Sequence, residues 1–214
     1  MFSSPFERKA FTLLTSLFIG SLVVAAFVSS KIINIFGFTA PAGVLAYSLT
    51  FIVSDVISEI WGKEQANEVV RSGFFALIAA ITLSWLAQIW DPAPFWQNQE
   101  AFKSVFSSTP RIVLASLTAY IISQNHDVWL FHFIKNITGQ KHLWIRNNAS
   151  TIISQLIDST VFVTVAFYGV LPVTDIILGQ WVAKIGIALL DTPFVYLVVS
   201  FIRFRTAGQT RAEA

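Results

Sequence analysis

The chain has 214 residues, 55% of them hydrophobic and only 12% charged, and its mean hydropathy is +0.66. Soluble domains carry about twice this charged fraction, so the composition indicates a membrane protein. The net charge of +2 arises in predicted loops without a basic, aromatic-interleaved patch, which argues against nucleic acid as a partner. The absence of cysteine excludes disulfides, thiolate metal sites and a cysteine nucleophile.

Six apolar runs are each long enough to span a bilayer, for which about 20 apolar residues are needed. They lie at Ala10–Ser29, Ala42–Trp61, Ser72–Trp90, Ile112–Phe133, Ala149–Leu171 and Leu178–Ile202. Because they use most of the chain, we predict an all-α integral membrane protein with six transmembrane helices. Residues 1–205 are expected to form this single domain, and residues 206–214 a disordered cytoplasmic tail.

The first apolar run follows Arg8 and Lys9, as the apolar core of a signal peptide would. It is long, however, and has no clear small-x-small cleavage site before Lys31. We therefore interpret it as a retained span.

Basic residues in the connecting segments predict how the spans are oriented. One side of the predicted membrane carries Arg8, Lys9, Lys63, Arg71, Lys135, Lys141, Arg146, Arg203, Arg205 and Arg211. The other side carries only Lys31, Lys103 and Arg111. Cytoplasmic loops have an excess of Lys and Arg, so both termini are expected in the cytoplasm.

Four spans carry polar side chains within the apolar sequence, where a charged group is costly and function is the default explanation. These are Asp55 and Glu59 in the second span, Gln124 and Asp127 in the fourth, Asn148, Thr151, Gln155 and Asp158 in the fifth, and Lys184 and Asp191 in the sixth. Steps of three and four residues place each set on one helical face. The second, fourth, fifth and sixth spans are therefore expected to line a polar cavity.

The phrase Ile-Ser-Gln-x-x-Asp occurs at residues 122–127 and again at residues 153–158. Phe131 and Phe162 follow the two copies at the same offset. Copies on antiparallel spans suit an inverted-topology repeat, although chance is the alternative. Asp158 is predicted near the midplane and Asp127 nearer the cytoplasmic end. We therefore expect Gln155 with Asp158 to form the principal recognition site, and Gln124 with Asp127 a supporting or gating site.

Each buried charge also has a structural explanation. Carboxylates such as Asp55 and Asp127 could pair with Lys184 or Arg111 and hold helices together, and for these two acids both roles stay open. Gating or charge pairing is the role expected of Lys184, Asp191, Arg111 and Glu59. His126, His132 and His142 share no ligand-like spacing with a carboxylate on one face, so no metal site is expected.

Buried charges between membrane spans also suit two functions other than transport. An intramembrane hydrolase is disfavoured because the acids are dispersed over several spans without a nucleophile–base pair, so no enzyme is expected. A cargo-free assembly subunit, for which charge pairs would suffice, remains the second alternative.

Four blocks of the sequence carry a family resemblance. They are TFIVSDVISEIWGK at 50–63, RIVLASLTAYIISQNHDVWLF at 111–131, WIRNNASTIISQLIDS at 144–159, and Lys184 followed by Pro193 and Tyr196. In this order and spacing they resemble the queuosine-precursor transporters, also called the vitamin uptake transporter family, over nearly the whole chain. One departure is Asn125-His126, where two apolar residues are expected; it makes that face more polar.

The resemblance implies import of a 7-deazaguanine base across the cytoplasmic (inner) membrane, for salvage of the tRNA nucleoside queuosine. The cargo would be 7-cyano- or 7-aminomethyl-7-deazaguanine, or queuine. The architecture implied is similar to that of the vitamin-binding subunits of energy-coupling-factor importers, with no cofactor, and a homodimer is compatible with it. The residues identify neither the preferred base nor the driving force, for which a proton, sodium and facilitated transport stay open.

A guanine-like edge suits the predicted polar face, because one carboxylate can accept its adjacent N–H and amino groups. We expect Asp158 with Gln155 to bind this edge, and Asp55 or Asp127 to meet a cationic aminomethyl group. Aromatic rings can stack on the flat base, although packing is the commoner role of such rings; the candidates are Phe51, Tyr120, Phe131 and Phe162. The expected substrate-binding residues are thus Gln155, Asp158, Asp55, Gln124, Asp127, Asn148, Thr151, Lys184, Phe51 and Phe162.

Overall fold

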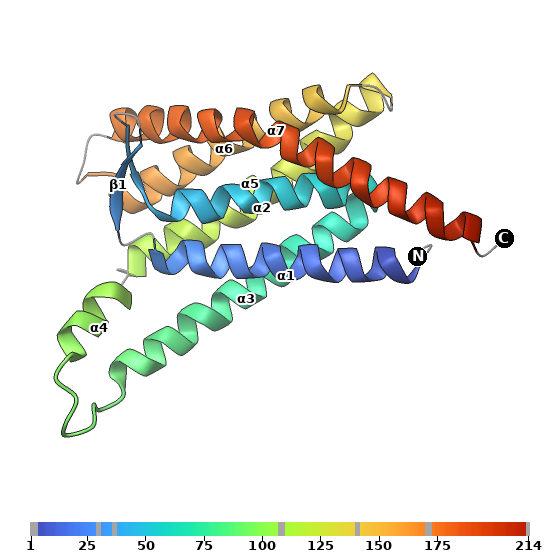
Figure 1. The fold of residues 1–214 in the computed structure, drawn as a ribbon. Coiled ribbons are helices and arrows are strands. Elements are labelled where there is room, and N and C mark those ends of the chain that lie inside the picture. The colour runs from blue at the N-terminus through green and yellow to red at the C-terminus, as the bar shows by residue number, and fades with distance from the viewer. Residues whose placement is uncertain are drawn as a thin grey trace.

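The computed structural model describes residues 4–28, 31–35, 38–106, 110–139, 142–169 and 173–212. These residues form a bundle of long helices with a two-stranded hairpin at one end (Figure 1). In chain order the elements are α1 (Pro5–Val28), β1 (Ile32–Ile35), β2 (Phe38–Pro41), α2 (Gly43–Ile60), α3 (Lys63–Ile89), α4 (Gln99–Phe106), α5 (Pro110–Thr138), α6 (Leu143–Phe167) and α7 (Val173–Ala212).

Each predicted apolar run coincides with a long helix, namely α1, α2, α3, α5, α6 or α7. Some boundaries differ: α3 begins at Lys63 rather than Ser72, because the charged segment before the apolar run is also helical. At the other end of the chain α7 continues to Ala212. Residues 206–212, which the sequence analysis placed in a disordered tail, therefore continue this helix.

Five helices in the described part of the chain are long and apolar enough to cross a membrane: α1, α2, α3, α6 and α7. The chain is therefore a multi-pass membrane protein. α5 does not meet the same criterion, although it has 29 residues. Its apolar sequence is interrupted by five consecutive polar residues at 123–127.

α2 and α5 run through the middle of the bundle (Figure 1), with α1 and α3 on one side of them and α6 and α7 on the other. The side formed with α1 and α3 is apolar, and its buried core includes Phe18, Ile57, Val70 and Val128. A second apolar cluster joins α2, α5, α6 and α7 around Phe131 and Val195. The polar side chains of the bundle lie between α2, α5, α6 and α7.

α3 approaches α1 and α5 closely at Gly73. A Cβ atom at this position would lie 2.6 Å from the Tyr120 hydroxyl and 2.7 Å from the Phe18 ring. The Tyr120 hydroxyl donates a hydrogen bond to the Val70 carbonyl at 2.8 Å. Any side chain at position 73 would displace these groups, so glycine permits the contact that fixes α3 against its neighbours.

The hairpin of β1 and β2 is an addition to the predicted all-α fold that the sequence analysis did not foresee. Its strands pair antiparallel, with Ile32 opposite Pro41 and Ile35 opposite Phe38. The β-branched isoleucines of β1 favour a strand, but the segment is too short to stand out between two apolar spans. β2 contacts α7 and leads into α2, so the hairpin places the start of α2 beside α7.

α7 changes direction along its length (Figure 1). Pro193 lies inside this helix. Proline has no N–H to donate and its ring crowds the preceding turn, which kinks a helix. Lys184 precedes the proline and Arg203 follows it, so these two basic residues of α7 serve different parts of the bundle.

Candidate functional site

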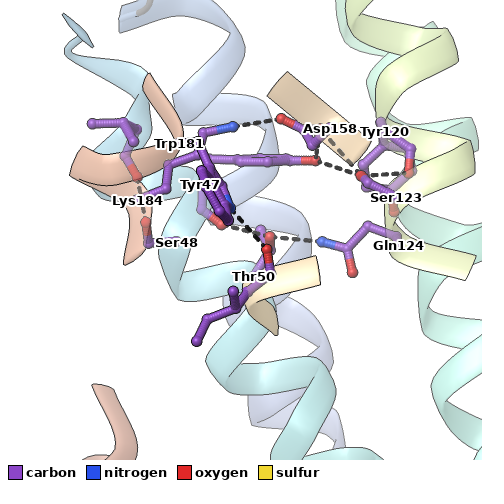
Figure 2. Close-up of polar contacts among 11 residues, drawn as sticks. Tyr47, Ser48, Thr50, Tyr120, Ser123, Gln124, Asp158, Trp181 and Lys184 are labelled. Carbon is purple, nitrogen blue, oxygen red and sulfur yellow. Dashed lines mark hydrogen bonds and ion pairs between the residues drawn. The ribbon is translucent and has the colours of Figure 1, made fainter. Parts of the chain in front are cut away.

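Asp158 of α6 lies at the meeting point of four helices (Figure 2). Its Oδ1 accepts hydrogen bonds from the Tyr47 hydroxyl of α2 at 2.8 Å and the Ser123 hydroxyl of α5 at 3.1 Å. Its Oδ2 accepts from Lys184 Nζ of α7 at 2.5 Å. A carboxylate with an ammonium and two hydroxyl donors is well compensated for its burial.

Lys184 is buried and points toward Asp158 above the Tyr47 ring (Figure 2). Its Nζ lies 5.5 Å from the centroid of that ring, within the range of a cation–π contact. The sequence predicted Lys184 as the counter-ion of a buried acid, and the structure pairs it with Asp158. The side chains of Arg111 and Asp191, its other predicted gating or charge-pairing companions, lie outside the part of the chain that the structure describes.

Gln124 and Gln155 present buried amides next to this network. Gln124 Nε2 donates to the Thr50 hydroxyl at 3.0 Å, and that hydroxyl donates to the Tyr47 carbonyl at 2.6 Å. The Oε1 atoms of both glutamines are buried and accept no hydrogen bond from the described residues. Two acceptors therefore face the bundle interior without a donor.

Asp127 and Asp55 form a second acidic region between α5 and α2. Both side chains are buried, and Asp127 is 0% exposed. Asp55 Oδ2 accepts a hydrogen bond from the Thr151 hydroxyl at 3.3 Å. Neither oxygen of Asp127 accepts a hydrogen bond from the described residues. The polar side chains of Asp55, Ser150 and Ser154 lie near it.

A small cavity of about 10 Å³ adjoins this acidic region. It is lined by Phe51, Ile52, Asp55, Asn147, Thr151 and Ala188. The side-chain oxygen of Asn147 is buried and, like the glutamine oxygens, accepts no hydrogen bond from the described residues. A single water molecule needs at least this much space, so this cavity is too small for a two-ring base.

Glu59 of α2 forms ion pairs with α5, α6 and α7, the helices that also meet at Asp158. Its Oε2 pairs with Lys135 Nζ of α5 at 3.1 Å and with an Arg146 Nη of α6 at 2.6 Å. Its Oε1 pairs with an Arg203 Nη of α7 at 2.5 Å. The Arg146 guanidinium also lies 5.6 Å from the centroid of the Phe131 ring. Three cations around one buried carboxylate connect all four helices, which agrees with charge pairing by Glu59.

The remaining predicted residues divide between this site and other contacts. Phe51 is buried and packs edge to face on Tyr47, with ring centroids 5.5 Å apart. Phe162 instead packs on Phe167, at 6.0 Å. Asn148 lies away from the network: its Nδ2 donates to the Thr192 hydroxyl of α7 at 2.7 Å. The structure therefore does not bring Phe162 or Asn148 to Asp158.

Tyr47 and Ser123 are site residues that the sequence analysis missed. Tyr47 is the first member of a stripe on α2 with steps of four residues, continued by Phe51, Asp55 and Glu59. Such a stripe lies on one helical face, and this signal was available from the sequence. Ser123 belongs to the repeated Ile-Ser-Gln-x-x-Asp phrase, but a serine inside a helix usually bonds its own backbone, so it was passed over.

Comparisons with known proteins identify relatives of this chain. Residues 41–198 match the model of a family described as "Putative vitamin uptake transporter". The chain is 34% identical over 179 residues to the "Probable queuosine precursor transporter" of Bacillus subtilis (strain 168), covering 80% of this chain and 77% of that protein.

Two further relatives are more distant. One is the "Probable queuosine precursor transporter" of Haemophilus influenzae, 26% identical over 135 residues, which are 63% of this chain and 55% of that protein. The other is the "Queuosine precursor transporter" of Escherichia coli (strain K12), 25% identical over 136 residues, which are 64% of this chain and 59% of that protein. No solved structure matches the chain.

Proposed function

Because the chain belongs to the vitamin uptake transporter family, we propose that it imports queuosine precursors, 7-deazaguanine bases, across the cytoplasmic membrane. It is a transporter and not an enzyme, in line with its relatives. The observation that carries the proposal is the buried polar network around Asp158, which lies between membrane-length helices of a chain with transporter relatives.

We propose α5 as the sixth span, in a six-helix architecture like that of the vitamin-binding subunits of energy-coupling-factor importers. Its polar residues Ser123, Gln124 and Asp127 are fully buried, whereas the apolar Trp129 and Phe133 are each 48% exposed. A helix with polar residues inside and apolar residues outside suits a lipid environment. The exposed apolar residues of α3 would likewise face lipid, or a second copy in a homodimer.

We propose that both termini are cytoplasmic, from the excess of Lys and Arg on one side. The chain has no native cysteine, so single cysteines report their own accessibility. Gln97→Cys, in the exposed segment after α3, should react with a membrane-impermeant maleimide in intact cells. Arg205→Cys in α7 should react only after the membrane is opened. The reverse pattern would overturn the orientation.

The proposed recognition site is Asp158 with Gln155 and Gln124. A guanine-like edge places an N–H beside an amino group, and a carboxylate can accept both. Oδ1 of Asp158 accepts from Tyr47 and Ser123, and Oδ2 accepts from Lys184. When the helices part, substrate donors would replace the two hydroxyls on Oδ1 and share Oδ2 with Lys184. Charge-assisted hydrogen bonds are then exchanged rather than lost.

The remaining groups of the site suit the rest of such a base. The Oε1 atoms of the two glutamines, which accept no hydrogen bond from the described residues, can accept from its other N–H groups. Tyr47 and Phe51 offer ring surfaces for stacking on the flat two-ring system.

Uptake by cells that express this chain alone tests the proposal. Cells lacking their own uptake route should accumulate labelled 7-cyano-7-deazaguanine when they express the wild type. Asp158→Asn should abolish accumulation, because an amide cannot accept both edge donors of the base. Asp91→Asn, in the exposed segment after α3, is the matched control and should transport normally.

The outcomes separate the alternatives once membrane insertion has been measured for each variant. A cargo-free subunit gives no uptake in the wild type, and an enzyme gives a chemically altered base. Normal uptake by a fully inserted Asp158→Asn variant would overturn the recognition site. Competition by the aminomethyl base and by queuine gives the substrate preference.

A further inference from the structure

Gln124 of α5 is held in one orientation by Thr50 of α2 (Figure 2). Its Nε2 donates to the Thr50 hydroxyl at 3.0 Å, and that hydroxyl donates to the Tyr47 carbonyl at 2.6 Å. Gln124 and Thr50 are both 0% exposed. The Gln124 Oε1 atom is turned away from Thr50 and accepts no hydrogen bond from the described residues. The glutamine therefore presents its carbonyl group to the interior of the bundle.

The direction of the two hydrogen bonds of Thr50 follows from the groups involved. A threonine hydroxyl has one hydrogen to donate, and a backbone carbonyl can only accept. Because this hydrogen lies on the Tyr47 carbonyl, the Thr50 oxygen offers lone pairs to Gln124 and requires its NH2 group. A reversed amide would place Oε1 against these lone pairs, or would take the hydrogen away from Tyr47. Either arrangement loses one hydrogen bond in a buried site.

Gln124 lies beside the proposed recognition site. The hydroxyl of the preceding residue, Ser123, donates to Asp158 at 3.1 Å, and the Tyr47 hydroxyl donates to it at 2.8 Å. These two hydroxyls are also 3.3 Å apart. This contact of α2 with α5 holds Asp158, and the adjacent contact of Thr50 with Gln124 orients the amide beside it.

We propose that Thr50 determines part of the substrate specificity, because its hydroxyl holds the Gln124 carbonyl in position to accept the pyrrole N–H of the base. Thr50 does not contact the substrate itself, so it is a positioning residue that acts through Gln124. This inference rests on the proposed function and names the chemistry that the site requires at one further position of the base.

The proposed contact with Asp158 leaves one ring N–H of a 7-deazaguanine without a partner. Asp158 would accept from the N–H and amino groups of the six-membered ring, so the N–H of the five-membered pyrrole ring remains. A carbonyl fixed by Thr50 accepts this hydrogen and repels a ring atom that carries a lone pair instead. An amide that is free to turn would accept either, because it has both a donor and an acceptor. Thr50 therefore makes this position selective for a donor.

Competition for uptake tests the inference in cells that express the full chain. Labelled 7-cyano-7-deazaguanine competes with the unlabelled base or with its furopyrimidine analogue, in which a ring oxygen replaces the pyrrole N–H. The discrimination ratio is the half-inhibitory concentration of the analogue divided by that of the base. For the wild type we expect a ratio of about ten or more, because a buried acceptor loses its donor and meets a lone pair.

Thr50→Val is the test variant, because it keeps the shape of the side chain and removes the hydroxyl. The Gln124 amide can then turn, so the ratio should fall about fivefold, which corresponds to one neutral hydrogen bond. Thr50→Ser retains a hydroxyl and should keep the wild-type ratio. Thr138→Val is the matched control and should also keep it, because the Thr138 hydroxyl donates to the Ile134 carbonyl of its own helix at 2.8 Å.

Two further measurements separate positioning from a purely structural role of Thr50. Gln124→Met removes the acceptor at similar side-chain length and should lower the ratio as Thr50→Val does. The double variant should show no further fall, because Thr50 acts through Gln124. The second measurement uses a base methylated on its carbonyl oxygen, which loses the ring N–H that Asp158 would accept. Discrimination against this ether should be the same in the wild type and in all of these variants.

Three results would overturn the inference: a wild type that does not discriminate against the furopyrimidine, a Thr50→Val variant with the wild-type ratio, or a Thr50→Val variant that loses discrimination against both analogues alike, as a generally loosened site would. The first result needs no variant, so the inference stays testable if Thr50→Val does not insert. Absence of any uptake of the labelled base by the wild type is a different result, because it contradicts the proposed function itself.

Discussion

The two acids of the repeated phrase, Asp127 and Asp158, lie in opposite environments. Asp158 receives an ammonium and two hydroxyl donors from three other helices. Asp127 receives no hydrogen bond from the described residues and faces a second acid. The same sequence motif on adjacent helices therefore has a compensated carboxylate in one copy and an uncompensated acid in the other. The difference comes from Tyr47 of α2 and Lys184 of α7, which contact only Asp158 of these two acids.

This contrast suggests different roles for the two acids. A compensated carboxylate can stay charged while buried, and it can exchange its partners for substrate groups. An uncompensated one depends on a mobile positive charge. The sequence analysis predicted Asp158 as the principal site and Asp127 as a supporting or gating one, and this division stays a prediction. Of these two acids, only Asp158 has an ion pair among the described residues.

Among the variants that test this contrast, Lys184→Met is expected to lower the stability of the protein most. Asp158 would keep its two hydroxyl donors but lose its counter-ion, and a buried charge left unpaired costs about 3–5 kcal/mol. The melting temperature of the detergent-purified protein should fall sharply. The double variant Lys184→Met with Asp158→Asn should recover most of the loss, because it removes the charge as well.

A control for Lys184→Met is available in the exposed pair of α4. Lys103 Nζ lies 3.9 Å from Glu100, and 45% of the lysine side chain is exposed. An exposed pair contributes at most about 1 kcal/mol, so Lys103→Met should leave the melting temperature nearly unchanged. If the two lysine variants melt alike, Lys184 does not compensate a buried charge.

A smaller effect is expected from Tyr47→Phe, which removes one donor from Asp158 and keeps the ring. A hydrogen bond to a charged group contributes about 1.5–3 kcal/mol, against about 1 kcal/mol for a neutral pair. Tyr120→Phe provides the comparison, since its hydroxyl donates at the same 2.8 Å to the neutral Val70 carbonyl. Denaturation of both variants should show the larger loss for Tyr47→Phe, and equal losses would contradict a charged Asp158.

Much of this contrast was predictable from the sequence, because membrane spans are set by local hydropathy. The apolar runs located the long helices, and the polar residues inside them located the network. The pairing of Lys184 was not predictable, since Asp55, Asp158 and Asp191 all lay within its reach. Which acid it meets depends on the rotation of α7 about its axis, and that is set by packing against other helices.

For aromatic residues too, the sequence does not determine which way a side chain on a span faces. Phe51 and Phe162 were equally good candidates, because a ring in a span can face either lipid or the interior. Only Phe51 packs on the network, through Tyr47, whereas Phe162 packs on Phe167. The hairpin of β1 and β2 was also missed, because its four-residue strands are shorter than the windows in which periodicity can be recognised.

Asp127→Asn is expected to change the melting temperature least, and to raise it rather than lower it. Since Asp127 has no cation and accepts no hydrogen bond among the described residues, its replacement removes no compensated interaction. The new amide can donate to Asp55, a gain of about 1 kcal/mol or less. Melting of Asp127→Asn should therefore match or slightly exceed that of the wild type, whereas Asp158→Asn should melt lower because Lys184 is left unpaired.

The pH at which the two aspartate variants are compared sharpens the test. The free energy of unfolding of the wild type should fall as the medium becomes alkaline, because Asp127 then loses its proton beside Asp55. Asp127→Asn cannot ionise at this position, so its advantage over the wild type should grow with pH. A constant difference at all pH values would show that Asp127 keeps one charge state throughout, and the contrast between the two acids would then be one of packing alone.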